Sequence, residues 1–448
     1  MKEEIESSAD MMVTRNNIKV WLGKTTRPTL SSKLLCDALS STGIITVGCR
    51  EDTEKKISSL LQTFVYSVSK GVTVIYVNRD KNWYAKDVIK DGRRIKPRFG
   101  YKVLMKTLTY LEGAGYIKLC KGFNIGRKKE DGYLILTEDF VTIIKSCTID
   151  KDKNVKEEMS SVVLKDVDGT PKTFSRKTWS NKIESVRSYN SFIGEFEITL
   201  DDDEAGEIEL TPWLCRIFKE NFKKHGRIYN TGEIINYQTL PQSDRNKIRI
   251  NGMETCEVDF KHLHPSILYA MEGKEVPGDV YSVGADYSEV FEMPNGNYPE
   301  EIIAIRGGRN AVKGAMLRVL NTSSRSACIQ SVVKMFKEDS EKEEHLRKYP
   351  TTIQDKKKAA ENLIKSIEEE HSAIKDYFYS EQSLMLMATD SEILMYILSE
   401  CQEEGILVLP VHDSLVCAKR YVKLVKEIMF DGYEAIMGTR LNCFVEVK

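Results

Sequence analysis

Three segments in the C-terminal half carry residues that could perform chemistry together. In the first, EVDFKHLHPSILYAMEG at 257–273, a strand pattern ends at Asp259 and a helix pattern follows. In the second, RGGRNAVKGAMLRVLN at 306–321, Arg309 and Lys313 are four residues apart, so a helix would place them on one face. In the third, LPVHDSLVC, Asp413 stands at a tight turn between two short strands.

These residue types suit nucleotidyl transfer. Asp259 and Asp413 on adjacent strands could hold two Mg²⁺ ions, or Mn²⁺ in their place, because such ions prefer carboxylate oxygens and keep water and phosphate oxygens as further ligands. Bound metal lowers the pKa of an attacking 3′-hydroxyl and neutralises the triphosphate and the leaving pyrophosphate. Lys313 and Arg309 would offset the charge that develops on the phosphates.

With these residues in place, the segments resemble motifs A, B and C of the family A DNA polymerases and the related single-subunit RNA polymerases. DFKHLHPSILY is similar to motif A, with Asp259 at the metal-binding aspartate, and also to the DxxSLYPS form of family B. The R-x3-K pair matches the start of the motif B helix, and VHDS matches motif C, with Asp413 as the second metal ligand beside His412. The resemblance covers roughly residues 210–448 and implies a right-hand polymerase acting on a primer–template with nucleoside triphosphates.

The chain departs from the family pattern where the nucleotide binds. Leu317 and Asn321 stand where family A usually has an aromatic residue and a Tyr or similar residue after the motif B lysine. At the gate against the ribose 2′-hydroxyl, family A DNA polymerases carry Glu, family B carries Tyr, and the RNA polymerases carry a small residue. His264 stands there and would crowd a 2′-hydroxyl, so dNTPs are predicted. Ser414 also occurs in the RNA polymerases, which keeps NTPs as an alternative.

Some residues have two interpretations. Arg306 could take the role of Arg309, His412 could position the turn or contact the primer terminus, and Arg245 could face template, nucleotide or solvent. The predicted catalytic residues are Asp259, Asp413, Lys313, Arg309 and His412. The predicted nucleotide-binding residues are Phe260, His264, Arg306, Arg309, Lys313 and Leu317.

A basic stretch in the first half predicts contact with a nucleic-acid backbone. Residues 79–130 hold fifteen basic and five acidic residues, with aromatic residues interleaved. A helix pattern at 101–113 precedes a hairpin pattern, 116–120 and 133–137, around a polar tip. This is the second half of a winged-helix module, or else a helix and hairpin that pack a core and keep their lysines in solvent. The predicted nucleic-acid-binding residues are Arg93, Arg94, Lys96, Arg98, Lys102, Arg127, Lys128, Lys129 and Arg245.

The patterns predict an α+β fold in which a right-hand palm and fingers core follows an N-terminal winged-helix-like α+β domain. Asn251-Gly252, between alternating runs, predicts a hairpin that leads into the strand of Asp259. The predicted parts are a DNA-binding region at 1–147 with its winged-helix-like module at about 67–147, a polar connector at 148–200, and a polymerase-like core at 201–448. Within the core we predict a thumb-like helix at 210–225, a palm at 245–305 and 381–448, and fingers at 306–380.

Composition limits the classes of protein. The 448 residues include 66 Lys+Arg, 67 Asp+Glu and 41% hydrophobic residues, which excludes wholesale disorder. No apolar run approaches the roughly 20 residues that span a bilayer, and the acidic start is no secretory signal, so we expect an intracellular protein without a membrane partner. Ten scattered cysteines without a CxxC pair favour core thiols over disulfides or zinc.

The sequence therefore predicts a nucleotidyltransferase, a DNA polymerase that extends a primer on a template. Residues 1–200 lack the dispersed acids of a 3′–5′ exonuclease, so no proofreading is expected, and the small size favours a prokaryotic phage, plasmid or mobile-element setting. One alternative is an RNA polymerase or primase that uses NTPs. The other is a replication-initiator-type DNA-binding protein with an inactive palm, against which the intact Asp259, Asp413 and Lys313 argue.

Overall fold

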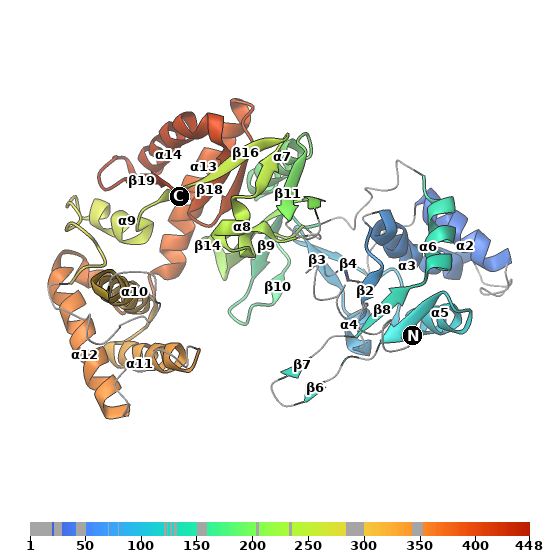
Figure 1. The fold of residues 1–448 in the computed structure, drawn as a ribbon, viewed down its shortest axis with the longest axis horizontal. Helices are drawn as coiled ribbons and strands as arrows, with labels where there is room; N and C mark the ends of the chain where they lie inside the picture. The colour runs from blue at the N-terminus through green and yellow to red at the C-terminus, as the bar shows by residue number, and fades with distance from the viewer. Residues whose placement is uncertain are drawn as a thin grey trace. The chain divides into compact units, whose positions relative to one another are not determined.

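The chain contains both helices and mostly antiparallel strands, which confirms the predicted mixture of α and β structure (Figure 1). The computed structural model describes residues 20–448 except 22–28, 42–50, 70, 79, 121, 123, 126–127, 130–131, 150–158, 203–205, 233–234, 284–299 and 343–352. The chain forms two compact units. The first consists of Met1–Ile217 and Tyr229–Gly252, and the second of Phe218–Ile228 and Met253–Lys448.

The N-terminal part of the first unit packs helices around a small sheet with the strand order β1-β2-β8-β5. Its elements are β1 (Val20–Trp21), α2 (Leu30–Ser41), α3 (Glu51–Ser69), β2 (Val74–Tyr76), α4 (Lys81–Ala85), β3 (Val88–Lys90), β4 (Arg93–Ile95), α5 (Tyr101–Gly113), β5 (Ile117–Cys120), β6 (Asn124–Ile125), β7 (Lys128–Lys129), β8 (Tyr133–Leu136) and α6 (Glu138–Cys147). Aliphatic and aromatic side chains of these helices and strands bury one another in a single core, where Phe64 meets Phe140 edge to face.

The helix and hairpin predicted for 101–137 are confirmed. Helix α5 buries Leu104, Leu108 and Leu111, the positions that share one helical face. Strands β5 and β8 then pair antiparallel, with Ile117 opposite Leu136. The assignment of this part to the winged-helix class stays a prediction.

The predicted polar connector, 148–200, is wrong, because its described residues fold. They form β9 (Val162–Lys165), β10 (Pro171–Lys172), α7 (Ser180–Ile193) and the start of β11 (Ile198–Asp202). Charged residues make this stretch polar on average, yet Ile183, Val186 and Ile193 recur at helical spacing and are buried. Composition averages over all faces of a helix, whereas burial depends on one face alone.

The predicted thumb-like helix at 210–225 is also wrong, since this segment forms the strands β13 (Leu214–Lys219) and β14 (Asn221–Asn230). Leu214 and Phe218 are buried, and a spacing of four residues keeps two side chains on one face of a strand as well as on one face of a helix. Glu220, with a φ of +62°, makes the turn between them. The first unit is completed by β12 (Gly206–Glu209), the 3₁₀ helix η2 (Tyr237–Thr239), α8 (Gln242–Arg245) and β15 (Ile248–Ile250).

The second unit is built on an antiparallel sheet ordered β17-β18-β16-β19. Helices α13 and α14 pack side by side against this sheet (Figure 1). Gly432 allows their close approach, since a Cβ atom there would lie 2.7 Å from Ile397 Cγ1. The elements are β16 (Met253–Phe260), α13 (Ser383–Glu403), β17 (Val408–Val411), β18 (Ser414–Ala418), the 3₁₀ helix η5 (Lys419–Tyr421), α14 (Val422–Met437) and β19 (Val445–Val447).

Further helices complete the second unit. They are α9 (Leu263–Met271), α10 (Glu300–Asn321), α11 (Arg325–Lys342), α12 (Ile353–Glu370) and the 3₁₀ helix η4 (Ser372–Tyr377). Apart from 245–252, which belong to the first unit, the segments predicted as palm and fingers thus lie within the second unit. The predicted boundary at 200/201 is not a unit boundary, because β13 and β14 carry the chain from the first unit into the second and back.

Candidate active site

Asp259 and Asp413 meet at one end of the sheet in the second unit. Asp259 is the next-to-last residue of β16 and pairs with Ser414, the first residue of β18. The register of β17 and β18 leaves His412 and Asp413 as a two-residue loop, in which His412 has a left-handed φ of +59°. The backbone N–H of Phe260 donates to the carbonyl of Asp413 over 3.3 Å. The end of β16 and the β17–β18 turn therefore bring together Asp259 and Asp413, the two carboxylates predicted from the sequence.

The carboxylates are only partly neutralised. Burial raises the pKa of Asp259 to about 6, and the charge of Asp413 adds to the rise. Lys448 opposes it, with Nζ 2.6 Å from Asp259 Oδ2 and 3.6 Å from Glu257 Oε1. Glu257 is itself buried and accepts a 2.5 Å hydrogen bond from Ser414 Oγ. Three acids thus gather around one ammonium group, an environment that favours a further cation.

Two cations of α10 flank a tyrosine that also experiences the charge of the carboxylates. The Arg309 guanidinium and the Lys313 Nζ lie 5.0 and 5.7 Å from the centroid of the Tyr281 ring. Burial raises the pKa of Tyr281 to about 12; Arg309 opposes this rise, and Asp413 adds to it. Arg309 also donates hydrogen bonds of 2.7 and 3.1 Å to Asp279, which hold the pKa of that carboxyl below its usual range although burial alone would raise it. The two cations therefore share one face of α10, as their spacing predicted, and both lie over the Tyr281 ring.

The other predicted residues of the second unit have different surroundings. Phe260 is 4% exposed and packs in the core, so its ring belongs to the interior at the end of β16. Leu317 is 41% exposed on α10. Arg306 lies within α10, and its side chain is outside the described residues. His264 lies in the first turn of α9, where its Nε2 is 2.8 Å from Asp390 Oδ2.

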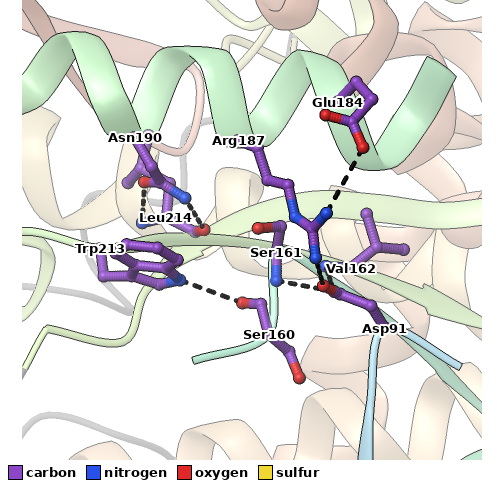
Figure 2. A network of polar contacts seen from close by, with 9 residues as sticks. All are labelled: Asp91, Ser160, Ser161, Val162, Glu184, Arg187, Asn190, Trp213 and Leu214. Carbon is purple, nitrogen blue, oxygen red and sulfur yellow. Dashed lines mark hydrogen bonds and ion pairs between the residues drawn. The ribbon is translucent and has the colours of Figure 1, made fainter. Parts of the chain in front are cut away.

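Figure 2 shows how a basic hairpin of the first unit is anchored. The turn between β3 and β4 is Asp91-Gly92, and both residues have left-handed φ, +43° and +78°. Oδ1 of Asp91 accepts from the backbone N–H groups of Ser161 and Val162 at 2.8 and 2.9 Å, and Oδ2 accepts from Arg187 Nη2 at 2.7 Å. The Asp91 side chain is 6% exposed, and three donors compensate for the loss of water around its charge.

The elements that receive this anchor are themselves bonded together. Asn190 of α7 exchanges two hydrogen bonds with the backbone of Leu214 in β13, at 2.7 and 2.9 Å (Figure 2). The indole N–H of Trp213 donates to the carbonyl of Ser160 over 3.2 Å, just before β9. Asp91 therefore docks the hairpin onto a framework of α7, β9 and β13.

Around the anchor, the predicted nucleic-acid-binding side chains reach solvent. The exposed ones are Arg93, Arg94, Lys96, Arg98 and, at the start of α5, Lys102. Arg127 is outside the described residues, and Lys128 and Lys129 form β7 with side chains that are likewise not described. Arg245 is half-buried in α8, where its Nη1 donates to the carbonyl of Leu240 over 2.5 Å. The cationic side chains of β4 and of the residues just after it therefore face solvent.

Sequence reasoning missed several residues that shape these sites. Tyr281 and Lys448 gave no motif signal, because a single Tyr or Lys has no distinguishing spacing. Asp390 lies 126 positions from its partner His264, and no local pattern connects two residues so far apart. Asp91 had a usable signal, since Asp-Gly between two short alternating segments predicts a hairpin turn.

A Mg²⁺ ion fits the carboxylate pair by the chemistry of its ligands. In the part of the chain that the structure describes, no group of three or more His, Cys, Asp or Glu side chains is arranged to hold a metal ion. Asp259 and Asp413 are a smaller set of oxygen ligands, of the kind Mg²⁺ uses together with phosphate oxygens and water. The Lys448 ammonium lies 2.6 Å from Asp259 Oδ2, so this carboxylate is already paired with one cation.

Comparison with known proteins adds little. No protein-family model matches the chain, and no curated protein matches it. Among solved structures, it is similar to the POL domain of Pol1 from M. smegmatis, solved in complex with DNA primer-template and dNTP. That match has 11% sequence identity and a TM-score of 0.26, and covers 94% of this chain and 66% of that one. Because the TM-score is so low, the likeness to a polymerase domain supports no functional conclusion.

Among the described residues, no helix is both long and apolar enough to cross a bilayer.

Proposed function

We propose that the chain is a nucleotidyltransferase that extends a nucleic-acid primer on a template with dNTPs. The observation that carries this proposal is the meeting of Asp259 and Asp413 at one strand end, within electrostatic range of the Tyr281 ring that Arg309 and Lys313 flank. Paired carboxylates beside paired cations suit a triphosphate carried with metal, since one group binds the metal and the other binds the phosphates.

Asp259 and Asp413 would hold Mg²⁺, or Mn²⁺ in its place. The bound metal would supply charge neutralisation at the triphosphate and activation of the primer hydroxyl. Lys313 is the better placed of the two cations for phosphate, because Arg309 is already paired with Asp279. Lys313 is exposed and makes no ion pair among the described residues, so it would bind phosphate oxygens without breaking an ion pair.

The β3–β4 hairpin would bind the backbone of the primer–template. Its exposed arginines and lysine supply sequence-independent affinity, because cationic side chains release counterions from nucleic acid. Its anchoring at Asp91 presents these charges in one orientation. Such contacts position a duplex without reading its bases, as a polymerase that copies any sequence requires.

Two other functions fit parts of the chain. An RNA polymerase or primase would use the same carboxylates and differ only in its choice of sugar. An initiator with an inactive palm would have no use for Asp259, whose charge is disfavoured by burial and by Asp413. Perturbed ionisable groups concentrate at functional sites, so this environment favours an active palm.

Primer extension tests the proposal. The full chain, a labelled primer–template and Mg²⁺ are incubated with dNTPs or with NTPs, beside an Asp413→Asn variant. We expect extension with dNTPs, reduced roughly 10²-fold or more in the variant, because loss of even an outer-shell partner of a metal ligand costs about 10–100-fold.

Asp376→Asn is the matched control, since Asp376 is an exposed acid of η4 in the same unit, and this variant should extend normally. Extension with NTPs alone would establish the RNA polymerase alternative. Duplex binding without extension by either substrate would establish the initiator.

A further inference from the structure

A buried charged cluster in the second unit surrounds His264. Asp390 Oδ2 accepts hydrogen bonds from Arg227 Nε at 3.1 Å and from Arg227 Nη2 at 2.6 Å. The same oxygen lies 2.8 Å from His264 Nε2. The exposed fractions of the three side chains are 6% for Asp390, 20% for Arg227 and 14% for His264. One carboxylate oxygen therefore holds both an arginine and the imidazole.

The hydrogen bond fixes the orientation of the imidazole ring. A carboxylate oxygen paired with a guanidinium only accepts, so His264 Nε2 must carry the hydrogen that joins it to Asp390. Turning the ring over would place a carbon atom where Nε2 lies and would break this bond. Arg227 Nη2, 3.3 Å from Nε2, donates to the same carboxylate and limits the space on that side.

The elements that carry the cluster are tied to one another as well. Ser391, the residue after Asp390 on α13, donates from Oγ to the carbonyl of Gly226 in β14. His225 and Gly226 both have left-handed φ, +70° and +71°, so β14 bends immediately before Arg227. Helix α13 thus bonds to β14 at two points. Ser391 contacts the backbone of Gly226, and Asp390 contacts the side chain of Arg227.

His264 is joined to the carboxylate site by a short path. It lies five residues after Asp259, in the first turn of α9, and this helix follows the left-handed residue His262. His262 Nδ1 is 3.0 Å from Ser266 Oγ, which strengthens this turn. Cluster and site therefore share the segment that runs from the end of β16 into α9.

We propose that Asp390 and Arg227 are positioning residues that hold the His264 imidazole in place, so that it excludes a ribose 2′-hydroxyl. This proposal rests on the proposed polymerase function and names its specificity determinant. A side chain excludes a hydroxyl group only to the extent that displacing the side chain costs free energy. An untethered His changes rotamer easily, whereas a ring bonded to a buried carboxylate must break a charge-assisted hydrogen bond, which is worth about 10–100-fold in discrimination.

The test is the ratio of kcat/KM for a dNTP to kcat/KM for the matching NTP, measured by primer extension with the full chain. Because Asp390→Ala would leave the largely buried Arg227 without its partner, the main variant is the neutral pair Asp390→Asn/Arg227→Gln. Its matched control is Arg325→Gln/Glu368→Gln, which removes another ion pair of this unit, between α11 and α12, away from His264.

We expect the Asp390→Asn/Arg227→Gln ratio to fall about 10-fold or more, through a gain in NTP use. The control pair should keep the wild-type ratio. In a His264→Ala background, where the ratio is already low, the same double substitution should change it no further, because Asp390 and Arg227 act through the imidazole.

Four results would overturn the proposal. The ratio could survive in Asp390→Asn/Arg227→Gln while falling in His264→Ala, or the two sets of substitutions could lower it independently. A His264→Ala chain with the wild-type ratio would show that the imidazole is no gate, although extension itself would leave the polymerase standing. A wild-type chain that extends no primer would overturn the polymerase function together with this proposal.

Discussion

Two buried carboxylates, Asp91 in the first unit and Asp259 in the second, serve opposite purposes. Asp91 accepts from two backbone N–H groups and one guanidinium, so its charge is fully compensated. Asp259 has one ammonium partner and lies beside Asp413 and Glu257, and its pKa is raised to about 6. A buried acid whose charge is fully compensated holds elements together. One whose charge is only partly compensated can bind a further cation.

The two regions are also assembled differently. The basic hairpin is a contiguous stretch that needs a single anchor, because backbone binding depends on charge density more than on exact geometry. The carboxylate site draws on β16, the β17–β18 loop, α10 and the segment around Tyr281, and the proposed transfer chemistry would require these groups to be placed to a fraction of an ångström. Substitutions at the two carboxylates should therefore separate activity from stability.

The largest effect should come from Asp259→Asn. Primer extension should fall roughly 10²-fold or more, because the proposed metal ligand is lost. The free energy of unfolding should stay within about 1 kcal/mol of wild type, since the change also relieves the repulsion from Asp413 and leaves Lys448, 32% exposed, free to rehydrate. Extension assays and urea unfolding measure the two quantities, and a large loss of stability would refute the assignment of Asp259 as an unsatisfied acid.

Asp91→Ala should do the reverse. It removes an acceptor from two backbone N–H groups and the partner of Arg187, which we expect to lower the free energy of unfolding by about 3 kcal/mol. Asp91→Asn should cost less, because an amide oxygen still accepts from the N–H groups and Asn tolerates the left-handed φ of +43°. Urea unfolding ranks the variants, and an Asn variant as unstable as the Ala variant would contradict this division of roles.

Neutralising the hairpin should weaken binding without unfolding the protein. Replacing Arg93, Arg94, Lys96 and Arg98 with alanine removes exposed charges, so duplex affinity should fall and the slope of log K against log salt should lessen by about 0.9 for each phosphate that the protein no longer neutralises. Fluorescence anisotropy at several salt concentrations measures the slope. The control removes the same charge from exposed lysines of the second unit, Lys357, Lys358, Lys365 and Lys375. An equal loss of affinity in both variants would deny the hairpin a specific role.

Local patterns predicted much of the carboxylate site and few of the contacts that support it. Strand β16, the His412-Asp413 turn and the shared face of Arg309 and Lys313 follow from spacing alone, because each depends on neighbours within a few residues. The strands β13 and β14 were misread, since a four-residue spacing suits helix and strand alike. The clusters of Asp390 and Asp91 depend on tertiary contacts across 70 or more positions, which no periodicity encodes.

The smallest effect concerns a buried histidine that supports the loop of Asp279 and Tyr281. His371 is fully buried, its Nε2 lies 3.0 Å from the carbonyl of Val280, and its Nδ1 lies 2.9 Å from the Tyr269 hydroxyl. Burial lowers the pKa of His371 in the folded protein. Because the unfolded chain binds this proton more readily, with a pKa of about 6.5, the stabilising contribution is present above that pH and is lost as the pH falls below it.

Urea unfolding at pH 7.5 and pH 5.5 measures this contribution. Wild type should lose about 1 kcal/mol more than His371→Gln between the two pH values, because a glutamine has no proton to take up. The difference between the two proteins isolates His371 from Asp259, whose raised pKa acts in the opposite direction over the same range. Equal pH dependence in both would show that His371 is not held neutral, and that the loop beneath Arg309 and Lys313 is stabilised by other contacts.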